Sequence, residues 1–212
     1  STPISINRKE NMTETVEFQP AKRYALKEAM DLFHCCGIKC IPAKPQSKVP
    51  AVNWKAYRLS PPSMSEIRDM FDQSGQRYDD SDGNPVEPEQ YNVAVLLGHR
   101  MKNGYYLAEY DADDKVAFER GLKLFGDKAT FVYQGQEGHG KIWFSTPVPV
   151  KNKTRRGAEI RSLGTITIAP DSIHPTTRNP YKYIKNGAIP KIELDEIPEL
   201  ELEPVSPDTI YD

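Results

Sequence analysis

Hydrophobic residues recur along the first third of the chain at spacings that predict two helices and a strand. From residue 21 to residue 36, apolar residues return every three or four positions, which predicts an amphipathic helix that ends at Gly37. The apolar run Ile38–Pro42 predicts a short buried strand. Farther along, Ser63 and Glu66 have the spacing of a capping box and predict the start of a second helix.

The rest of the chain carries mainly strand patterns. Asn92–Leu97 and Tyr105–Tyr110 predict two strands, and the Asn103–Gly104 turn signal between them would allow a hairpin. Apolar residues near one face predict a helix over residues 114–125. Further strands are predicted at Thr130–Gln134, Lys141–Ser145, Ala158–Arg161, Thr165–Ala169 and Tyr181–Ile184. Helices combined with antiparallel strands predict an α+β fold.

The 212 residues divide into three regions. Residues 1–20 are polar without a sustained period and predict a flexible N-terminal arm. Residues 21–190 carry the helix and strand patterns, and their number fits one folded domain. Residues 191–212 are acidic and contain prolines, which predicts a tail or linker.

Composition narrows the class of protein. With 38% hydrophobic and 27% charged residues, the chain has the balance of an ordinary globular protein. No apolar run approaches the ~18 residues that cross a bilayer, and the start of the chain does not resemble a signal peptide. We therefore expect an intracellular, cytoplasmic protein with no membrane partner.

The net charge of -2 is unevenly distributed. Residues 193–212 contain eight acidic residues and no Lys or Arg, so the remaining chain carries 28 basic against 22 acidic residues. This excess of positive charge favours an anionic partner, because positive grooves attract phosphates in a salt-dependent way.

Three cysteines, Cys35, Cys36 and Cys40, form an odd-numbered cluster that does not suit a disulfide framework. We expect reduced thiols that serve as small buried residues. Because His34 adjoins them, a zinc site is the alternative, although the spacing lacks the paired knuckles of structural zinc sites.

The most informative polar pattern is the alternation of Glu109, Asp111 and Asp113 with smaller or aromatic residues. In a strand, residues two apart face the same way, so these carboxylates can converge on one face. Carboxylates that converge repel one another unless cations neutralise them, and their hard oxygens favour Mg²⁺ or Mn²⁺. The alternative is an acidic strand end that runs into a helix cap, which would make Asp113 and Asp114 structural.

A glycine-containing turn precedes the strand predicted from Lys141. Gly138 and Gly140 flank His139, and such a turn lets a phosphate approach the backbone closely. His139 and Lys141 are two residues apart and can contact that phosphate from one side of the strand. The alternative is a polar turn that binds no ligand.

A third polar segment contains Glu159 and Arg161, which share a predicted strand face, and then Ser172 and His174. A metal-binding carboxylate and a phosphate-binding guanidinium can therefore stand side by side. The alternative is a surface ion pair. Lys48, in a basic loop, is a candidate contact for the phosphates of DNA or of a nucleotide, or else an ordinary surface lysine.

Taken in order, these segments resemble the bifunctional primase-polymerase family of the archaeo-eukaryotic primase superfamily, the type found in plasmid and viral replication proteins. The acidic strand around Asp111 resembles the first catalytic motif, and Gly138–His139 resembles the second. Glu159–Arg161, with the downstream segment 169–175, resembles the third. The helix and basic loop around Lys48 resemble the opening of such domains.

The resemblance covers roughly residues 21–185 and includes departures. Members of the family carry Asp-x-Asp or Asp-x-Glu in the first motif, and here either Asp111 with Asp113 or Glu109 with Asp111 fits. The third carboxylate, Glu159, is Asp in many relatives. The carboxylates that the chemistry requires are all present.

The resemblance implies a catalytic domain over residues 21–190, with a subdomain shaped like an RNA-recognition module packed on a smaller N-terminal α/β unit. It implies a DNA primase and polymerase that joins nucleotides with Mg²⁺ or Mn²⁺ held by Asp111, Glu159 and either Asp113 or Glu109. Single-stranded DNA and nucleoside triphosphates, ribo- or deoxyribo-, are the implied partners, and a helicase domain or protein is a further one.

By the same resemblance, His139 and Arg161, with Lys141 as a weaker candidate, bind the incoming triphosphate. Ser172 and His174 complete that pocket, and Lys48 contacts DNA. Two alternatives remain open. One is a non-catalytic DNA-binding replication initiator module, and the other is a metal-dependent nuclease.

Overall fold

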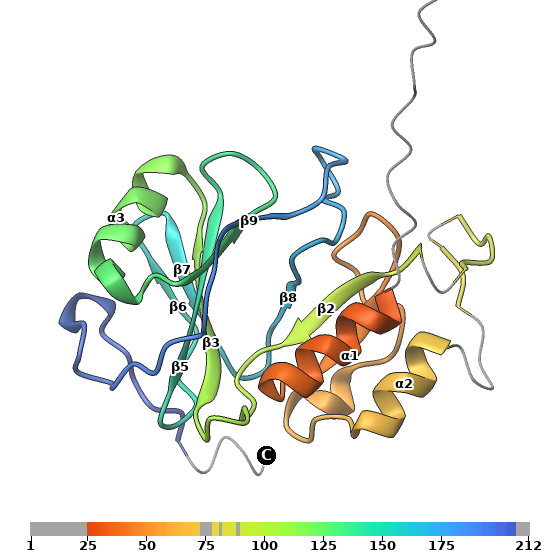
Figure 1. Cartoon of the computed structure of the whole chain (residues 1–212), viewed down its shortest axis with the longest axis horizontal. Helices are drawn as coiled ribbons and strands as arrows, with labels where there is room; N and C mark the ends of the chain where they lie inside the picture. The colour runs from red at the N-terminus through yellow and green to blue at the C-terminus, as the bar shows by residue number, and fades with distance from the viewer. Residues whose placement is uncertain (1–24, 73–77, 81, 88–89, 207–212) are drawn as a thin grey trace, which may run out of the picture.

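The computed structural model describes residues 25–72, 78–80, 82–87 and 90–206, which form two antiparallel sheets with helices packed on them (Figure 1). The predicted arm, residues 1–20, lies outside the described residues. Mixed helices and antiparallel strands agree with the predicted α+β class. None of the described helices is long and apolar enough to cross a membrane.

A small unit is built on a three-stranded sheet with the order β1-β2-β8. Its strands are β1 (Cys40–Ala43), β2 (Asn92–Leu96) and β8 (Ile166–Ile168). Helices α1 (Ala25–Cys36) and α2 (Met64–Asp72) pack against this sheet and bury their apolar faces there (Figure 1). Because β8 comes late in the chain, the small unit is not formed by the N-terminal part alone.

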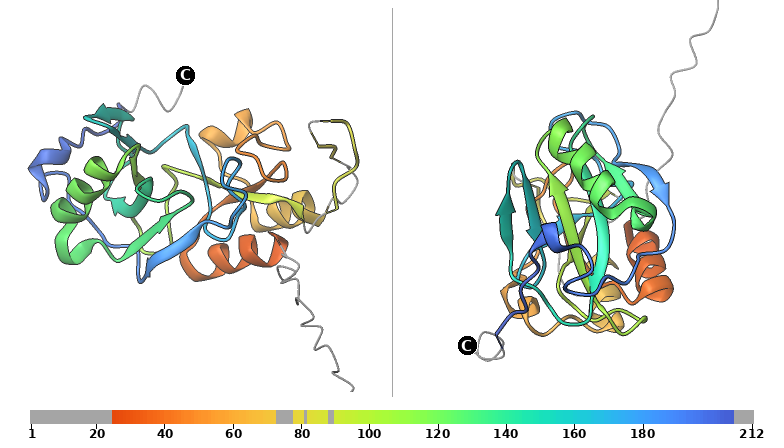
Figure 2. Two further views of the ribbon diagram at one scale, coloured as in Figure 1. Left: turned by 90° about the horizontal axis from the view of Figure 1, so that it is seen from above. Right: turned by 90° about the vertical axis from the view of Figure 1, so that its left-hand side faces the viewer.

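A six-stranded sheet with the order β6-β7-β3-β5-β4-β9 forms the large unit. Its strands are β3 (Tyr106–Ala112), β4 (Phe131–Gln134), β5 (Gly140–Thr146), β6 (Lys153–Arg155), β7 (Ala158–Arg161) and β9 (Lys182–Asn186). Helix α3 (Lys115–Phe125) covers one face of this sheet, and the other face contributes aromatic residues to the core of the small unit. The two units lie side by side (Figure 2). Short 3-10 helices connect the elements: η1 (Lys55–Arg58), η3 (Gly126–Lys128) and η4 (Pro198–Leu200).

Local signals start and end the helices where the sequence pattern predicts. Gly37, with φ 71°, ends α1, and its N–H donates to a carbonyl one turn earlier at 2.8 Å. The capping box forms, because the Glu66 carboxylate accepts the N–H of Ser63 and the Ser63 hydroxyl accepts the N–H of Glu66, each at 3.1 Å. Asp114 caps α3 by accepting the N–H of Ala117 at 2.8 Å.

The predicted hairpin forms only near its tip. β2 pairs with β1 and β8, whereas β3 pairs with β5 and β7, so the two strands belong to different sheets. Contact between their connecting segments is local, and there the N–H of Gly98 donates to the carbonyl of Leu107 at 2.8 Å. The hairpin prediction is therefore wrong for the strands themselves, because a turn signal sets a reversal of the chain but not the sheet that each strand joins.

Residues 191–206 differ from the predicted tail or linker. Ile192, Ile197 and Leu200 are buried in the same core cluster as α3. The Glu203 carboxylate pairs with the Lys153 ammonium of β6 at 2.9 Å. Glu203 thus faces a basic residue of the large sheet while apolar residues of the segment fill the core, so the segment is part of the folded large unit.

An aromatic cluster lies on the face of the large sheet that is turned toward the small unit. The rings of Phe131 and Trp143 are stacked with centres 4.5 Å apart, and Tyr133 meets Trp143 edge-on at 5.5 Å. The Tyr133 hydroxyl donates to the carbonyl of Ile168 in β8 at 2.7 Å. This hydrogen bond and the packed rings connect the two sheets.

The chain passes from the small unit to the large unit at Gly98. There its backbone lies so close to the backbone of Leu163 that only glycine fits. Its φ is +80°, and a Cβ at this position would lie 2.2 Å from the Cα of Leu163. Gly164 offers a matched comparison, because its φ is +81° and a Cβ there would meet nothing within 4 Å.

We expect Gly98→Ala to destabilise the fold far more than Gly164→Ala. Both substitutions place a Cβ on a left-handed backbone, which costs about 1–2 kcal/mol. Only the change at Gly98 also forces the Leu163 backbone to move, so its total cost should exceed about 4 kcal/mol. Urea unfolding curves of the two variants check this. Equal losses of unfolding free energy would show that the contact between Gly98 and Leu163 does not hold the units together.

Candidate active site

Strand pairing brings the predicted polar residues of three strands onto one face. Asp111 of β3 lies opposite Lys141 of β5 and Glu159 of β7. Glu109 lies opposite Trp143 and Arg161 in the next row. Directly paired residues project to the same side of a sheet, so these side chains share the face turned toward the small unit. We call this set the charged face: Glu109, Asp111, Lys141, Trp143, Glu159 and Arg161.

Glu109 is the buried centre of the charged face. It is 0% exposed, and one carboxylate oxygen accepts the indole N–H of Trp143 at 2.8 Å. The other oxygen lies 3.4 Å from the Lys141 ammonium and 3.8 Å from the Arg161 guanidinium. Burial alone would lower the pKa of Lys141, but the charges of Glu109 and Asp111 outweigh burial and raise that pKa. Lys141 is therefore a permanent cation of this face.

Asp111 stands nearer the surface, between two cations. One carboxylate oxygen lies 3.0 Å from the Lys141 ammonium, and the other lies 3.5 Å from the Arg161 guanidinium. Glu159 is more open, with 48% of its side chain exposed, and its carboxylate lies 3.9 Å from Arg161 Nε. Glu159 and Arg161 thus stand side by side as predicted, but at the outer limit of an ion pair.

Asp113 and Asp114 differ in what their side chains do. Asp114 is the cap of α3, so the structural interpretation holds for this residue. Asp113 follows the end of β3 and is exposed, and its backbone N–H donates to the carbonyl of Gly157 at 2.7 Å. The hydrogen bond fixes the backbone of Asp113 and leaves its carboxylate facing solvent.

The carboxylates suit a hard divalent cation by their chemistry. Asp111 and Glu159, directly opposite each other on neighbouring strands, supply the oxygen ligands that Mg²⁺ and Mn²⁺ prefer. Within the described part of the chain, however, no three His, Cys, Asp or Glu side chains are gathered around one point. To bind such an ion, Asp111 would have to exchange a contact with Lys141 or Arg161 for the metal.

His139 and His174, both predicted to bind phosphate, have different environments. His139 is exposed in the turn before β5. His174 is only 8% exposed, and its Nδ1 accepts the N–H groups of Thr176 and Thr177, each at 3.1 Å. Burial, followed by the charges of Lys48, His139 and Lys141, lowers the pKa of His174. His174 is thus a neutral ring near several cations, with Nε2 as its N–H donor.

Ser172 has a structural contact of its own. It is 0% exposed, and its hydroxyl accepts the N–H of Val93 in β2 at 3.1 Å. Its backbone N–H donates to the carbonyl of Ala169 at 3.3 Å, and its carbonyl accepts the N–H of Tyr181 at 2.7 Å. The structure therefore places Ser172 inside the fold, where it fixes the loop that carries His174.

Between the units lies a cavity of about 150 Å³ that we call the interunit cavity. Lys48 of the small unit and Lys141 and Arg161 of the charged face line it, together with Thr167 of β8 and Tyr181. Burial, followed by the charge of Lys141, lowers the pKa of Lys48, which places this lysine close to the charged face. The sequence-predicted cations of three separate segments thus meet at one cavity.

Trp143 and Tyr181 belong to the site although sequence reasoning did not assign them to it. Trp143 is two residues from Lys141, so the strand alternation that places Glu109 beside Asp111 also places these two side chains on one face. No comparable signal points to Tyr181, because its position depends on how the loop after β8 returns to the large sheet.

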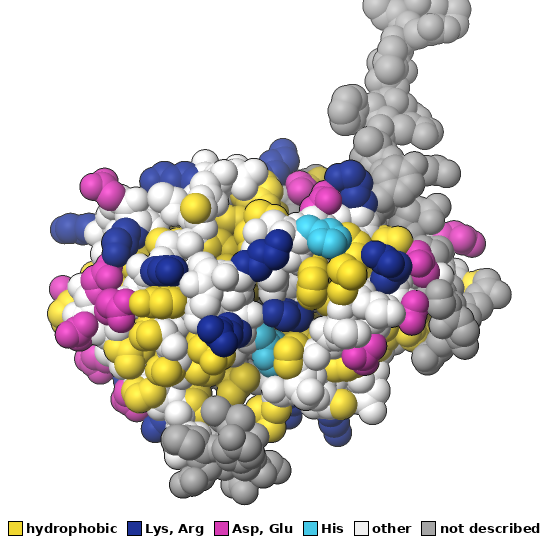
Figure 3. Space-filling view, turned by 60° about the horizontal axis from the view of Figure 1, so that its bottom comes forward, with side chains coloured by type: hydrophobic (Ala, Val, Ile, Leu, Met, Phe, Trp, Pro, Cys, Tyr) yellow, Lys and Arg dark blue, Asp and Glu magenta, His cyan; other side chains and the backbone are white. Residues whose placement is uncertain are grey.

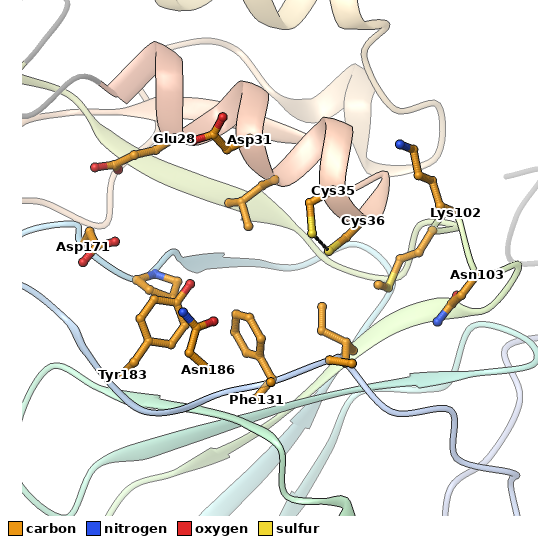
Figure 4. Close-up of a pocket in the computed structure, with 16 residues that line it drawn as sticks. Glu28, Asp31, Cys35, Cys36, Lys102, Asn103, Phe131, Asp171, Tyr183 and Asn186 are labelled. Carbon is orange, nitrogen blue, oxygen red and sulfur yellow. Dashed lines mark hydrogen bonds between the residues drawn. The ribbon is translucent and has the colours of Figure 1, made fainter.

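A larger cavity of about 890 Å³ lies at the other edge of the same sheet face. Cys35 and Cys36 of α1 face Phe131 and Tyr183 across it, with the two sulfur atoms 2.7 Å apart (Figure 4). Cys40 is buried in β1 instead. None of the charged-face residues lines this cavity, so the predicted site and this cavity are separate.

Basic side chains gather along the seam between the units. Figure 3 shows Lys and Arg across the middle of one face, with Asp and Glu mainly toward its sides. A groove of about 610 Å³ at this seam is lined by Lys55 and Arg58 of η1 and by Lys151 of the large unit. Arg58 also contacts the ring of Trp54, with its guanidinium carbon 5.3 Å from the ring centre. Cationic and aromatic groups together suit a single-stranded nucleic acid.

The fold and the charged face define an α+β protein whose sheet combines carboxylates with lysine and arginine side chains on one face. A family model described as "Bifunctional DNA primase/polymerase, N-terminal" matches residues 29–200, and the chain belongs to this Prim-Pol family. Membership implies a nucleotidyltransferase that acts on DNA and nucleotides. Among curated proteins, no sequence matched the chain.

We expect Lys141→Met to lower the free energy of unfolding by about 3–5 kcal/mol, because it leaves the Glu109 carboxylate buried without its principal cation. The double variant Glu109→Gln/Lys141→Met should lose much less than the sum of the two single changes, since the uncharged amide at position 109 can still accept the Trp143 N–H. Urea unfolding of the wild type and the three variants gives this double-mutant cycle. Additive losses would show that Glu109 and Lys141 do not depend on each other.

Proposed function

We propose that the chain is a primase-polymerase that synthesises and extends primers on a single-stranded DNA template in plasmid or viral DNA replication. The observation that carries this proposal is the direct pairing of Asp111 with Glu159, with Arg161 beside both, inside the segment that matches the Prim-Pol family. Two carboxylates and a guanidinium on one open face are the groups that phosphoryl transfer requires.

The order of the central strands supports an RNA-recognition-like catalytic subdomain. Strands β3, β4, β5 and β7 occur in this sequence along the chain, with β6 between β5 and β7 and α3 between β3 and β4, but they lie in the order β7-β3-β5-β4 in the sheet. The first strand therefore sits in the middle of the sheet, as in a split β-α-β arrangement. This order puts Asp111 between Lys141 and Glu159.

Burial favours one register of the first motif. Glu109 is 0% exposed and already has Trp143 and Lys141 as partners, so it serves as the internal anchor of the charged face. Asp111 and Asp113 lie toward the open end of β3. We therefore assign the metal-binding roles to Asp111, Asp113 and Glu159.

The chemistry that Mg²⁺ or Mn²⁺ supplies at these carboxylates, when bound, is activation of the attacking hydroxyl and stabilisation of the leaving pyrophosphate. Arg161 can grip phosphate oxygens with two N–H donors, and His139 is exposed beside the turn where a phosphate can approach. Neutral His174 offers its Nε2 proton as a hydrogen bond donor. Lys141 contributes fixed positive charge but is engaged by Glu109 and Asp111.

For the template, we propose the basic groove of Lys55, Arg58 and Lys151 along the seam (Figure 3). Its cations come from both units, so a strand bound there would contact both units. Lys48 faces the charged face rather than this groove, which moves it from the predicted DNA contact toward nucleotide binding.

The function is tested by nucleotide incorporation on single-stranded and primed templates, with and without Mn²⁺ or Mg²⁺. We expect template-dependent products only when metal is present. Binding of DNA without metal-dependent incorporation would identify a non-catalytic initiator module instead. Shortening of the primer without consumption of nucleoside triphosphates would identify a nuclease.

Asp111→Asn should reduce incorporation by at least about a hundredfold, because it removes a metal ligand while keeping the size of the side chain. Asp113→Asn should also reduce incorporation severely. The control is Asp127→Asn, a change at an exposed acid of η3 on a different part of the large unit. Primer extension with a fixed amount of folded protein measures the effect, and activity of Asp111→Asn within a few-fold of the wild type would contradict the assignment.

Glu159→Gln should cripple primer extension and weaken binding of Mn²⁺ while the melting temperature barely changes. The small effect on stability follows from the exposed, 3.9 Å contact with Arg161, since such pairs contribute only about 0–1 kcal/mol. Glu119→Gln is the matched control, because Glu119 forms an exposed pair with Lys115 at 4.0 Å on α3. Near-normal extension by Glu159→Gln at every Mn²⁺ concentration would remove Glu159 from the site.

A further inference from the structure

Tyr181 carries a buried polar atom that the fold leaves unsatisfied. The residue is 2% exposed, and its hydroxyl oxygen has no hydrogen bond partner among the described residues. Buried polar groups are nearly always paired, so an exception calls for a ligand or water. Tyr181 lines the interunit cavity, where that missing partner can be supplied.

The hydroxyl is a donor at this position. Burial, with smaller influences from Lys141, Asp111 and Glu109, raises the pKa of Tyr181 to about 12, so the proton is retained at neutral pH. The same influences place the hydroxyl near the charged face.

The cavity lining has an excess of positive charge. Lys48, Lys141 and Arg161 line it, and none of the acidic side chains that the structure describes does so. Lys141 and Arg161 already face Glu109 and Asp111, whereas Lys48 forms no ion pair with any described residue. One unpaired cation, that of Lys48, and two hydroxyls without a hydrogen bond partner, those of Tyr181 and Thr167, therefore line the same small space.

The volume limits what can enter. About 150 Å³ is the space of about five water molecules, which suits a phosphate group but not a nucleoside. The two cations shared with Asp111 keep that phosphate next to the carboxylates of the charged face.

We propose that the interunit cavity binds a phosphate group from the triphosphate tail of the incoming nucleotide, with the Tyr181 hydroxyl donating a hydrogen bond to it and Lys48 supplying the charge. This inference rests on the proposed function, and it assigns Tyr181 and Lys48 a joint role in nucleotide recognition. Because Lys48 belongs to the small unit and Arg161 to the large unit, the bound phosphate also joins the two units.

Tyr181→Phe tests the inference because it should leave stability unchanged or higher while it weakens the binding of phosphate. The change removes a hydroxyl without a protein partner, so the melting temperature of the free protein should stay the same or rise. Binding of inorganic pyrophosphate, measured by calorimetry in EDTA, should weaken about tenfold or more, because a hydrogen bond to a charged group is lost. Lys48→Met should weaken pyrophosphate binding as well.

Tyr110→Phe is the matched control. The Tyr110 hydroxyl is also buried, but it donates to the carbonyl of Ala117 at 2.7 Å on the α3 side of the sheet. We expect this variant to lose stability and to bind pyrophosphate like the wild type. A loss of stability in Tyr181→Phe with unchanged pyrophosphate binding would overturn the inference and show that the hydroxyl is structural.

Two further titrations identify the source of the phosphate. In every variant, the affinity for a nucleoside triphosphate should change in the same way as the affinity for pyrophosphate. A single-stranded oligonucleotide, by contrast, should bind Tyr181→Phe and the wild type equally. Weaker binding of the oligonucleotide alone would assign the cavity to the DNA backbone and overturn the inference. Failure of the wild type to bind pyrophosphate would also overturn it.

The outcome is separable from that of the proposed function, because pyrophosphate binding requires no catalysis. A wild type that binds pyrophosphate through Tyr181 but incorporates no nucleotide would refute only the polymerase function. A wild type that extends primers while Tyr181→Phe binds pyrophosphate and nucleoside triphosphate normally would refute only the phosphate assignment.

Discussion

The buried carboxylate of Glu109 is the constraint on which the charged face depends. A charge at 0% exposure is tolerable only with partners, and Trp143 and Lys141 provide them from the neighbouring strand. Shifting β3 by one residue would turn Glu109 into the apolar core beneath α3, so the pairing register is strongly specified. The same register places Asp111 opposite Glu159.

In this arrangement the basic side chains differ in whether carboxylates already hold them. Lys141 is held by two carboxylates and supplies charge without freedom to move, whereas Lys48, which lines the same interunit cavity, forms no ion pair with any described residue. In the function we propose, fixed charge near the reacting groups is useful because it needs no reorganisation when the charge of the transition state develops. The seam between the units then supplies both the nucleotide cavity and the template groove.

The two units depend on each other through few but specific contacts. Strand β8 brings residues from late in the chain into the small sheet, and the Tyr133 hydroxyl reaches its Ile168 carbonyl. Gly98 allows the backbone to pass Leu163 at a distance that no other residue permits. A ligand that contacts Lys48 on one side and Arg161 on the other would therefore add to an interface that the fold already maintains.

The sequence by itself determined the helices, most strands and their caps, because hydrophobic period and capping chemistry act over a few residues. Ser63 with Glu66 and Asp114 before α3 are examples. It also determined that Glu109 and Asp111 share a face, since alternation is a property of any strand. Only the tertiary structure decided which of these carboxylates is buried, because burial depends on the small unit packing above them.

The same distinction explains the differences between prediction and structure. Charge and proline content predicted a tail over residues 191–212, but Ile192, Ile197 and Leu200 find a core that exists only once α3 and the large sheet have packed. A turn signal predicted pairing of β2 with β3, although sheet membership is set by all competing strands. No sequence signal pointed to Tyr181 as a residue of the site, because an unpartnered hydroxyl is defined by what surrounds it, and those surroundings come from segments far apart in the sequence.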